Sequence, residues 1–490
     1  MSKKLVIALD IGTTSAKAVI FELNGKLVAE AERMITSDYP QPGWVEQDPV
    51  QIERSSVWAI RDVMTKANVK PDELLTLGIS CAMHSLICVD HNYKPLSQAI
   101  IWADGRSNQQ ANNLKRTNGN EIYAKTGLPN HPMSPLSKLL WMKETGFEPY
   151  NEAAYFVSAK EYVIQKWFGQ RLIDYSMASA TGLFNMKTFD WDEEALALAD
   201  IDRIQLSEIV PPTEILTGID IGIADEMGIS KDMPFVIGSA DGQLANLGSG
   251  AIFPGEVAIS AGTSGAIRQM INGFEVSENQ ETFCYAFTRE LSIIGGPTNN
   301  GGIALQWLKE LIDYDGSYDE LTAEAVKVSP GAEGLLFLPY INGERAPVWN
   351  QEAKGNFFGL SITHKKEHLV RAVLEGITYN LYHIGKALER QAGEPEKIFV
   401  SGGLARSPLW VQMLADVFGK EVYLSESHHS AAWGAAWTAL VAIGKVDSFE
   451  DIKQNIPIEA IIKPDQHNHE IYEEAFRKYE KIARDLAKYF

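Results

Sequence analysis

The chain has few cysteines and no long hydrophobic run, and both absences narrow its class. Only three cysteines occur in 490 residues, Cys81, Cys88 and Cys284, and their spacing fits neither a disulfide framework nor a Cys-x-x-Cys metal site. We therefore expect buried, reduced thiols in a cytoplasmic protein. The longest apolar stretch, residues 431–443, is shorter than the about 20 residues that span a bilayer, so it predicts a core helix and no membrane association.

Positive charge is also scarce in this sequence. Lysine and arginine number 44 against 64 aspartates and glutamates, which gives a formal net charge of −20. Nucleic-acid binding needs clustered cations that displace counterions, so this balance argues against a nucleic-acid partner. An anionic small molecule stays possible as a ligand, because a local cationic pocket can overrule the overall field.

The common nucleotide-binding motifs are missing, and a repeated turn stands in their place. No GxxxxGK[ST] segment occurs, and no GxGxxG segment follows a strand. The turn Gly-Thr-Thr-Ser-Ala begins at Gly12, and Gly-Thr-Ser-Gly-Ala begins at Gly262, which is 262 − 12 = 250 residues later. Such turns can direct several backbone N–H groups and hydroxyls at a phosphate, so we predict a duplicated phosphate-binding hairpin. The alternative is that threonine serves only the turn.

Length and repeat together predict two domains. A single hydrophobic core stops growing at about 250 to 300 residues, and half of this chain is close to the repeat offset. Glycine and proline cluster at residues 248–255, so we predict one domain over residues 1–247 and a second over residues 248–490.

The hydrophobic pattern predicts α/β architecture in both halves. In the first half an antiparallel meander is expected, followed by alternating helices and strands, at residues 5–9, 18–21, 26–31, 49–67, 77–81, 87–90, 235–237 and 243–247. In the second half the turn repeat is followed by predicted elements at residues 302–312, 367–391, 397–400, 408–418 and 472–489.

Two aspartates are the candidates for phosphoryl-transfer chemistry. Asp241 follows an apolar strand and lies between small residues, which suits a general base that accepts the proton of an attacking hydroxyl. Its alternative is a helix N-cap. Asp10 precedes the first turn where the second copy has Ser260, so only one half offers a carboxylate to a metal ion. Its alternative is a turn residue at a strand end.

Polar and aromatic residues follow two further strands, where α/β folds bind ligands. They are Met83, His84 and Ser85 after one strand and Trp102, Asp104 and Arg106 after the other. An indole, an imidazole, a carboxylate and a guanidinium together give a polyol pocket one apolar face and several hydrogen-bonding groups. The alternatives are a structural histidine at His84 and a surface ion pair between Asp104 and Arg106.

Two long segments of the chain resemble the signatures of the FGGY carbohydrate kinases, the family of glycerol, xylulose and gluconate kinases. They are residues 133–144, from Met133 to Glu144, and residues 355–375, from Gly355 to Glu375. The twin turns, the Asp241 loop and Gly402-Gly403 occur in the expected order, and the resemblance covers essentially the whole chain. It implies an α/β, two-domain actin-like ATPase (ribonuclease H-like) fold, duplicated, with a ligand cleft between the domains. It also implies a possible homodimer.

The resemblance implies a role for each matching residue. Asp241 would be the base, and Asp10 would associate with Mg²⁺ through water. The implied ATP contacts are Gly12, Thr13, Thr14, Lys17, Gly262, Thr263, Gly302, Gly402, Gly403 and Ser407. The implied substrate contacts are Met83, His84, Ser85, Trp102, Asp104, Arg106, Asp241 and Gln243. Leu404 departs from the pattern, because the family usually has a third glycine there, and its β-carbon would narrow the turn.

Residues 82–86, 295–302 and 339–347 look most like the gluconate kinases of this family. The expected reaction is ATP-dependent phosphorylation of a sugar acid, D-gluconate, to 6-phosphogluconate. We expect Arg106, Lys138 or His84 to meet the substrate carboxylate and Glu344-Arg345 to form a structural ion pair. The alternatives are a xylulose or other pentulose or polyol kinase and, more remotely, a non-catalytic actin-like sugar sensor or a polymer-forming ATPase.

Overall fold

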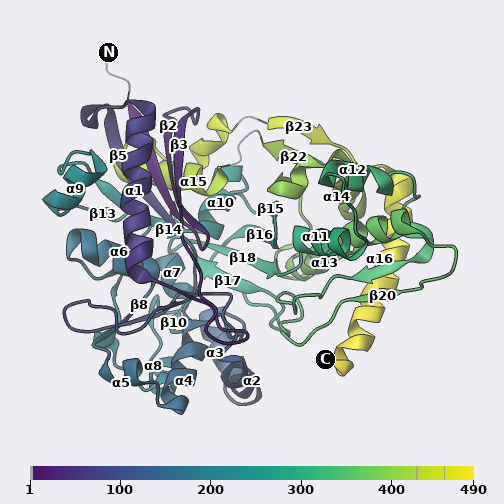
Figure 1. Cartoon of the computed structure of the whole chain (residues 1–490), viewed down its shortest axis with the longest axis horizontal. Helices are drawn as coiled ribbons and strands as arrows, with labels where there is room; N and C mark the ends of the chain where they lie inside the picture. The colour runs from purple at the N-terminus through teal and green to yellow at the C-terminus, as the bar shows by residue number, and fades with distance from the viewer. Residues whose placement is uncertain (1–3, 426–428, 457) are drawn as a thin grey trace.

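The computed structural model describes residues 4–425, 429–456 and 458–490. Two α/β halves lie side by side, each built around a mixed β-sheet (Figure 1). Within these ranges no helix is both long enough and apolar enough to span a membrane.

The first sheet has the strand order β13-β14-β5-β1-β2-β3. Strands β1 (Leu5–Ile11), β2 (Ser15–Glu22) and β3 (Leu27–Met34) form the predicted antiparallel meander, and β5 (Leu74–Cys81) runs parallel to β1. Strand β1 is apolar on both faces except at Asp10, because helices cover both sides of the sheet. Helix α1 (Pro49–Ala67) covers β2 and β3.

The second sheet repeats the plan of the first. Its strand order is β17-β18-β16-β15-β21-β22-β23. Strand β15 (Glu256–Ala261) pairs antiparallel with β16 (Gly265–Asn272) and parallel with β21 (Lys397–Ser401), as β1 does with β2 and β5. The ends of β16 lie 265 − 15 = 250 and 272 − 22 = 250 residues after those of β2, so the repeat seen in the sequence is a repeat of structure.

Helix α15 (Ser430–Ala442) crosses from the second half to the first. It packs against α10 (Asp241–Ser249) and against β5, β1 and β14 (Phe235–Ala240), and Figure 1 shows it beside the first sheet. The approach is close: a β-carbon on Gly434 would lie 2.0 Å from the Leu244 carbonyl oxygen. The expectation of a core helix at residues 431–443 is confirmed. The domain boundary at 247/248 falls in the last turn of α10 and stays a prediction.

The predicted helices of the second half are present. They are α11 (Gly302–Leu311), α13 (Lys366–Ala392), α14 (Pro408–Phe418) and α16 (Gln466–Leu486). Helix α14 has the predicted ends, and the ends of the other three are shifted. Helix α16 begins six residues before the predicted start, 472 − 466, because the side chain of Asp465 accepts a hydrogen bond from the Asn468 backbone N–H at 3.0 Å and caps the helix.

The remaining elements complete the two halves. The other helices are α2 (Asn108–Arg116), α3 (Gly119–Thr126), α4 (Pro135–Thr145), α5 (Glu148–Glu152), α6 (Ala159–Phe168), α7 (Tyr175–Ser179), α8 (Glu193–Ala199), α9 (Ile221–Met227) and α12 (Tyr318–Ala325). The other strands are β4 (Glu46–Gln47), β6 (Ile87–Val89), β7 (Ala99–Ile100), β8 (Tyr155–Val157), β9 (Leu172–Asp174), β10 (Phe184–Asn185), β11 (Asp190–Trp191), β12 (Glu208–Val210), β13 (Ile215–Leu216), β17 (Phe283–Ala286), β18 (Leu291–Thr298), β19 (Leu336–Leu338), β20 (Asn356–Phe358), β22 (Val422–Ser425) and β23 (Ile458–Ile462).

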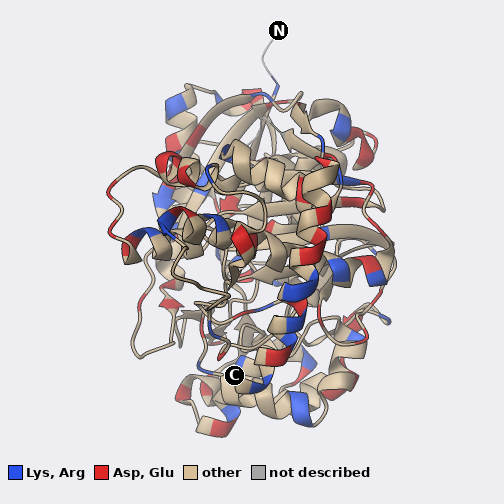
Figure 2. Cartoon of the chain, turned by 90° about the vertical axis from the view of Figure 1, so that its right-hand side faces the viewer, with Lys and Arg blue, Asp and Glu red and all other residues tan. Residues whose placement is uncertain are grey.

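Acidic and basic residues are mixed on the side of the molecule shown in Figure 2. Both colours occur there on many segments of the ribbon, and α16 itself contains residues of both signs. Favourable pairs accompany this mixing, such as Lys478 Nζ and Glu474 Oε1 at 2.7 Å on successive turns of α16.

Candidate functional site

A cavity of about 340 Å³ lies where the two hairpins face each other. Both halves contribute to its wall, together with Asp241 at the start of α10. The lining residues are Gly12, Thr13, Thr14, Ala82, Met83, His84, Trp102, Asp241, Ser260, Ser264, Gly265, Ala266, Arg268, Phe283, Tyr285, Pro297 and Arg345.

The two hairpins have the same backbone connection. The N–H of Gly12 donates to the Ser15 carbonyl at 3.0 Å, and the N–H of Gly262 donates to the Ser264 carbonyl at 2.9 Å. Helix α11 begins at the second hairpin, where the Gly302 N–H donates to the Gly262 carbonyl at 2.7 Å. The N-terminus of α11 therefore adds its positive dipole end to the cleft.

The predicted ATP contacts fall into two groups. Gly12, Thr13 and Thr14 line the cavity. Gly262 and Thr263 are exposed at the tip of their turn beside it, and Lys17 stands opposite Asp10 in the register of β1 and β2 without lining the cavity.

A hydrogen-bonded network behind Asp241 positions its loop. The Ser176 hydroxyl oxygen accepts from the Ala240 N–H and from the Ser239 hydroxyl, both at 2.7 Å, and Ser176 in turn donates to Asp174. Lys160 Nζ lies 2.6 Å from Asp174 Oδ2, so the network is anchored by a buried ion pair. The carboxylate that follows is thereby held at a fixed place.

Asp241 presents its carboxylate to the cavity. Ala240, not Asp241, is the N-cap of α10, so the capping alternative is wrong. In the part of the chain that the structure describes, Asp241 Oδ1 accepts one hydrogen bond, from the Gly242 N–H at 2.7 Å. Burial raises the pKa of Asp241 to about 6, and the neighbouring charge of Asp10 adds to the increase. A base with such a pKa is ionised at neutral pH and can accept a proton.

Asp10 is a second carboxylate close to the cleft. The Ser80 hydroxyl donates to Asp10 Oδ1 at 2.7 Å, and burial raises the pKa of Asp10. Asp10 lies inside β1, so it is not a turn residue. The charges of Lys17 and His429 act against the increase in the pKa of Asp10. Within the described ranges no group of three or more His, Cys, Asp or Glu side chains that could hold a metal ion is found. Two carboxylates suit Mg²⁺, which keeps several waters and takes its other ligands from phosphates.

Three of the predicted substrate contacts, Met83, His84 and Trp102, line the cavity. His84 adopts the left-handed conformation with φ 69°, and its Nδ1 lies 2.8 Å from the Ala180 carbonyl oxygen. Nδ1 must carry the proton in that contact, which leaves Nε2 as an acceptor, 3.4 Å from the Tyr285 hydroxyl. Burial lowers the pKa of His84 to about 3, so this ring is neutral and supplies no cation for a carboxylate.

Asp104 and Arg106 do not line the cavity, which contradicts their prediction as substrate contacts. Both side chains are fully buried: Arg106 Nη2 lies 2.8 Å from Asp104 Oδ2 and 2.7 Å from Glu46 Oε1. The Arg106 guanidinium also stacks over Trp44 at 3.9 Å. The surface ion-pair alternative is wrong as well, because the pair holds the interior of this region together.

Three other predicted contacts are also absent from the cavity wall. Lys138 Nζ donates to the backbone carbonyls of His84 and Ile100, so its charge does not reach the cavity. The Ser85 hydroxyl oxygen accepts from the Ala159 N–H at 2.9 Å, at the start of α6. Gln243 is buried and absent from the cavity wall.

Sequence reasoning missed several residues of the wall, above all two arginines. Arg268 lies two positions after Ala266 on β16, so strand alternation places both on the cavity face. That alternation is the signal that could have identified Arg268. The prediction of a Glu344–Arg345 ion pair is wrong: Glu344 Oε1 accepts from the Arg345 backbone N–H at 2.8 Å, while the guanidinium of Arg345 lines the cavity.

The predicted nucleotide edge lies at the end of β21. Gly402 has φ 93°, and a β-carbon there would lie 2.6 Å from the Ala261 carbonyl oxygen, so glycine is needed for two reasons. Gly402 lines a further cavity, of about 610 Å³. Gly403 is the next residue in the chain and is not among the residues that line this cavity. Leu404 is buried in the hydrophobic core. Ser407 caps α14 by accepting from the Trp410 N–H at 3.4 Å, which gives its hydroxyl a structural role.

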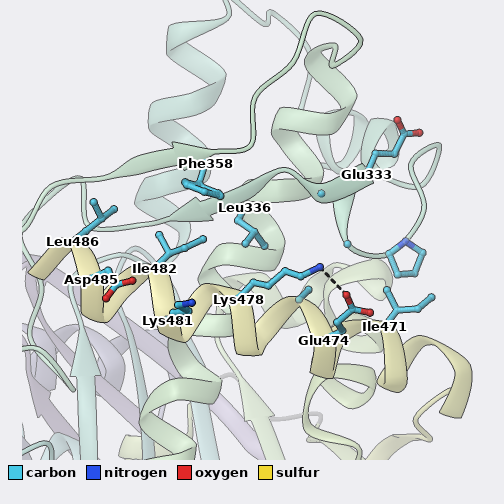
Figure 3. A pocket seen from close by; sticks show the side chains of 14 residues that line it. Glu333, Leu336, Phe358, Ile471, Glu474, Lys478, Lys481, Ile482, Asp485 and Leu486 are labelled. Carbon is cyan, nitrogen blue, oxygen red and sulfur yellow. Dashed lines mark hydrogen bonds and ion pairs between the residues drawn. The ribbon is translucent and has the colours of Figure 1, made fainter.

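Another groove, of about 600 Å³, belongs wholly to the second half. Leu336, Phe358, Ile482 and Leu486 gather along it between β19, β20 and α16 (Figure 3). Its charged side chains include the Lys478–Glu474 pair, and neither hairpin reaches it. The smaller cavity, and not this groove, brings the predicted base Asp241 together with residues of both hairpins.

The duplicated α/β halves, the twin hairpins and the acidic residue between them define a two-domain enzyme of the actin-like ATPase class. Models of the FGGY family of carbohydrate kinases match the N-terminal domain at residues 5–248 and the C-terminal domain at residues 257–443. The chain belongs to the FGGY family of carbohydrate kinases.

Individual relatives agree with this assignment. A gluconokinase of Bacillus subtilis (strain 168) is 44% identical over 466 residues, covering 92% of this chain and 90% of the relative. A crystal structure of gluconate kinase from Lactobacillus acidophilus superposes with a TM-score of 0.95 at 33% identity, covering 99% of this chain and 98% of the other. The ligand-bound xylulose kinase from the same organism gives a TM-score of 0.96, also at 33% identity and the same coverage.

Proposed function

We propose that the protein phosphorylates D-gluconate on its terminal hydroxyl, with ATP as donor, to give 6-phosphogluconate. The observation that carries this proposal is the position of Asp241, between two phosphate-type hairpins and a pocket of His84, Trp102 and Tyr285. A base with a pKa of about 6 faces the place where a sugar hydroxyl and a γ-phosphate meet.

The choice of gluconate rests on sequence similarity and on charge. Structural similarity alone does not separate gluconate kinase from xylulose kinase, because both superpose equally well. The identity of 44% with a gluconokinase favours the sugar acid. The cavity also contains two guanidinium groups, of Arg268 and Arg345, against the single carboxylate of Asp241, and this excess of positive charge suits an anionic substrate.

In the proposed reaction Asp241 accepts the proton of the terminal hydroxyl while that oxygen forms a bond to the γ-phosphorus of ATP. The bond from that phosphorus to the β,γ-bridging oxygen breaks, and ADP leaves with the electron pair. Thr13, Thr14 and the backbone N–H groups of both hairpins orient the phosphates. Asp10, through water, and the phosphates would hold Mg²⁺, which neutralises phosphate charge when bound.

The compartment and the oligomeric state proposed for this enzyme are those expected from the sequence. All three cysteines are free and buried, which suits a reducing, cytoplasmic compartment. A homodimer stays a prediction.

A panel of acceptors tests the proposal. Release of ADP is measured with D-gluconate, D-xylulose, glycerol and D-glucose, each at the same ATP and Mg²⁺ concentrations. We expect the highest kcat/KM with D-gluconate. Preference for D-xylulose would instead establish the pentulose alternative, and no sugar-dependent ADP release would favour the sensor.

A further inference from the structure

The positive charge of the cavity comes from residues other than those predicted to meet the substrate carboxylate. Arg106 and Lys138 are engaged in buried contacts, and His84 is neutral. The two cations that line the cavity are Arg268 and Arg345. Arg268 lies on β16, and Arg345 lies in the segment between β19 and β20.

Arg268 keeps most of its donors free. Its one hydrogen bond in the described part of the chain runs from Nη1 to the Ser260 hydroxyl at 3.3 Å. Burial lowers the pKa of Arg268, and the charge of the Asp241 carboxylate opposes that decrease. The Arg268 guanidinium packs against the start of α10, where a β-carbon on Gly242 would lie 2.9 Å from Arg268 Nε. A guanidinium has five N–H donors, so four remain for a ligand.

Position along β16 separates Arg268 from the phosphate hairpin. Ala266 lines the cavity next to the turn, and Arg268 follows two residues later on the same face, about 7 Å farther along the strand. It stands opposite Gly295 on β18, which in turn pairs with Phe283 on β17. Phe283 lines the cavity and stacks on Tyr285 at 4.2 Å, and the Tyr285 hydroxyl lies 3.4 Å from His84 Nε2. Arg268 is therefore on the strand face that leads towards the predicted substrate contact His84.

Arg345 approaches the same space from another direction. Its guanidinium lies 4.8 Å over the Trp102 ring, and Nη2 donates to the Thr298 carbonyl at 3.3 Å. Its Nε is buried and has no hydrogen-bond partner in the described residues. Burial lowers the pKa of Arg345 to about 10, so it is still charged at neutral pH. A buried donor without a partner is costly, and a bound anion would satisfy it.

We propose that Arg268, with Arg345 as second donor, binds the carboxylate of the sugar acid and thereby selects gluconate over neutral polyols. This inference rests on the proposed function and names the part of the site that sets its specificity. An arginine fork matches two carboxylate oxygens in one plane, which a lysine does not.

The test compares D-gluconate with D-gluconamide, which has a neutral amide in place of the carboxylate. Steady-state kcat and KM are measured for both acceptors and for ATP, in the wild type, Arg268→Gln and Arg268→Lys. Arg477→Gln is the matched control, because Arg477 is exposed on α16, away from the cavity. Circular dichroism and thermal melting check that each variant folds.

We expect Arg268→Gln to raise the KM for gluconate by about tenfold to a hundredfold, the range of a lost charge-assisted hydrogen bond. The KM values for gluconamide and ATP should change little, and Arg268→Lys should recover part of the loss. The wild type itself should prefer gluconate to gluconamide, which tests the inference even if a variant fails to fold.

Three results would count against the inference in different ways. Equal losses with gluconate and gluconamide would remove the carboxylate role. A rise in the KM for ATP alone would assign Arg268 to the phosphates. Wild-type enzyme that turns over a neutral sugar but not gluconate would overturn the proposed function itself, and with it the carboxylate subsite.

Discussion

At the scale of single residues, the chemistry depends on where carboxylates are buried. Burial raises the pKa of both Asp241 and Asp10, and the charge of Asp10 adds to the increase at Asp241. Folding places them there at an energetic cost, which is typical of residues retained for function.

Replacing Asp241 by asparagine removes the base while keeping the shape of the side chain. We expect kcat for gluconate to fall by about two to four powers of ten, the usual contribution of general base catalysis. Gluconate binding, measured by isothermal titration calorimetry, should persist. A variant that turns over at nearly the wild-type rate would exclude Asp241 as the base.

The pKa of Asp241 predicts how activity depends on pH. A base must be unprotonated, and burial raises the pKa of this carboxyl to about 6, so activity is lost as pH falls through that value. We expect kcat/KM for gluconate to be level above pH 7 and to drop about tenfold per unit well below pH 6. Initial rates from pH 4.5 to 8 measure this; a kcat/KM that stays level down to pH 4.5 would contradict the raised pKa.

The position of a site residue could be predicted where it belongs to a local sequence motif. The prediction failed where the position depends on contacts with residues distant in sequence. The hairpins, Met83, His84, Trp102 and Asp241 were found, because strand ends and small-residue turns mark such positions. Arg106 was misplaced because its partner Glu46 is 60 residues away, 106 − 46, and nothing local reveals that pairing. Arg268 was overlooked because its side chain reaches the cavity only through the packing of β16 beside α10, and that packing is a tertiary contact.

At the scale of elements, the contact between α10 and α15 fixes the start of α10 and so the base. Gly434 has no side chain to separate the two helices, and Leu244 O occupies the space that a β-carbon would need. Propensity alone would favour alanine here, so the glycine is explained by packing. The helices were predicted with nearly correct ends, but this pairing was not, since the two segments are almost 190 residues apart.

Gly434→Ala should therefore affect stability and catalysis together. We expect the free energy of unfolding to fall by about 1 to 3 kcal/mol from overpacking, and kcat to fall because α10 must shift. Denaturant melts and ADP release measure the two effects. Gly222→Ala is the control, since its β-carbon would meet only its own capping carboxylate, at 3.2 Å. An unchanged Gly434→Ala protein would show that the helices separate freely.

At the scale of the whole molecule, duplication could be predicted from the sequence because the offset of 250 is exact in both strand and turn. The packing of α15, a helix of the second half, on the first sheet could not be predicted. Periodicity reveals which face of a helix is apolar but not which sheet the helix covers. Two halves around one cleft also suggest motion on ligand binding.

We expect gluconate and a non-hydrolysable ATP analogue together to make the protein more compact. Closure would exclude water and limit ATP hydrolysis without substrate. Small-angle X-ray scattering of the free protein, each binary complex and the ternary complex measures the radius of gyration. An identical radius in all four states would contradict closure.

The placement of α15 also affects the order in which the chain can fold during synthesis. Residues 430–442 cover β5 and β1, so the first sheet keeps one bare face until the ribosome has made most of the polypeptide. Amino-terminal segments usually fold first as they emerge, but here the earliest strands wait for one of the last helices. The nascent chain thus exposes an apolar, aggregation-prone sheet face for the longest part of translation. A chaperone that shields this face would raise the yield of native enzyme.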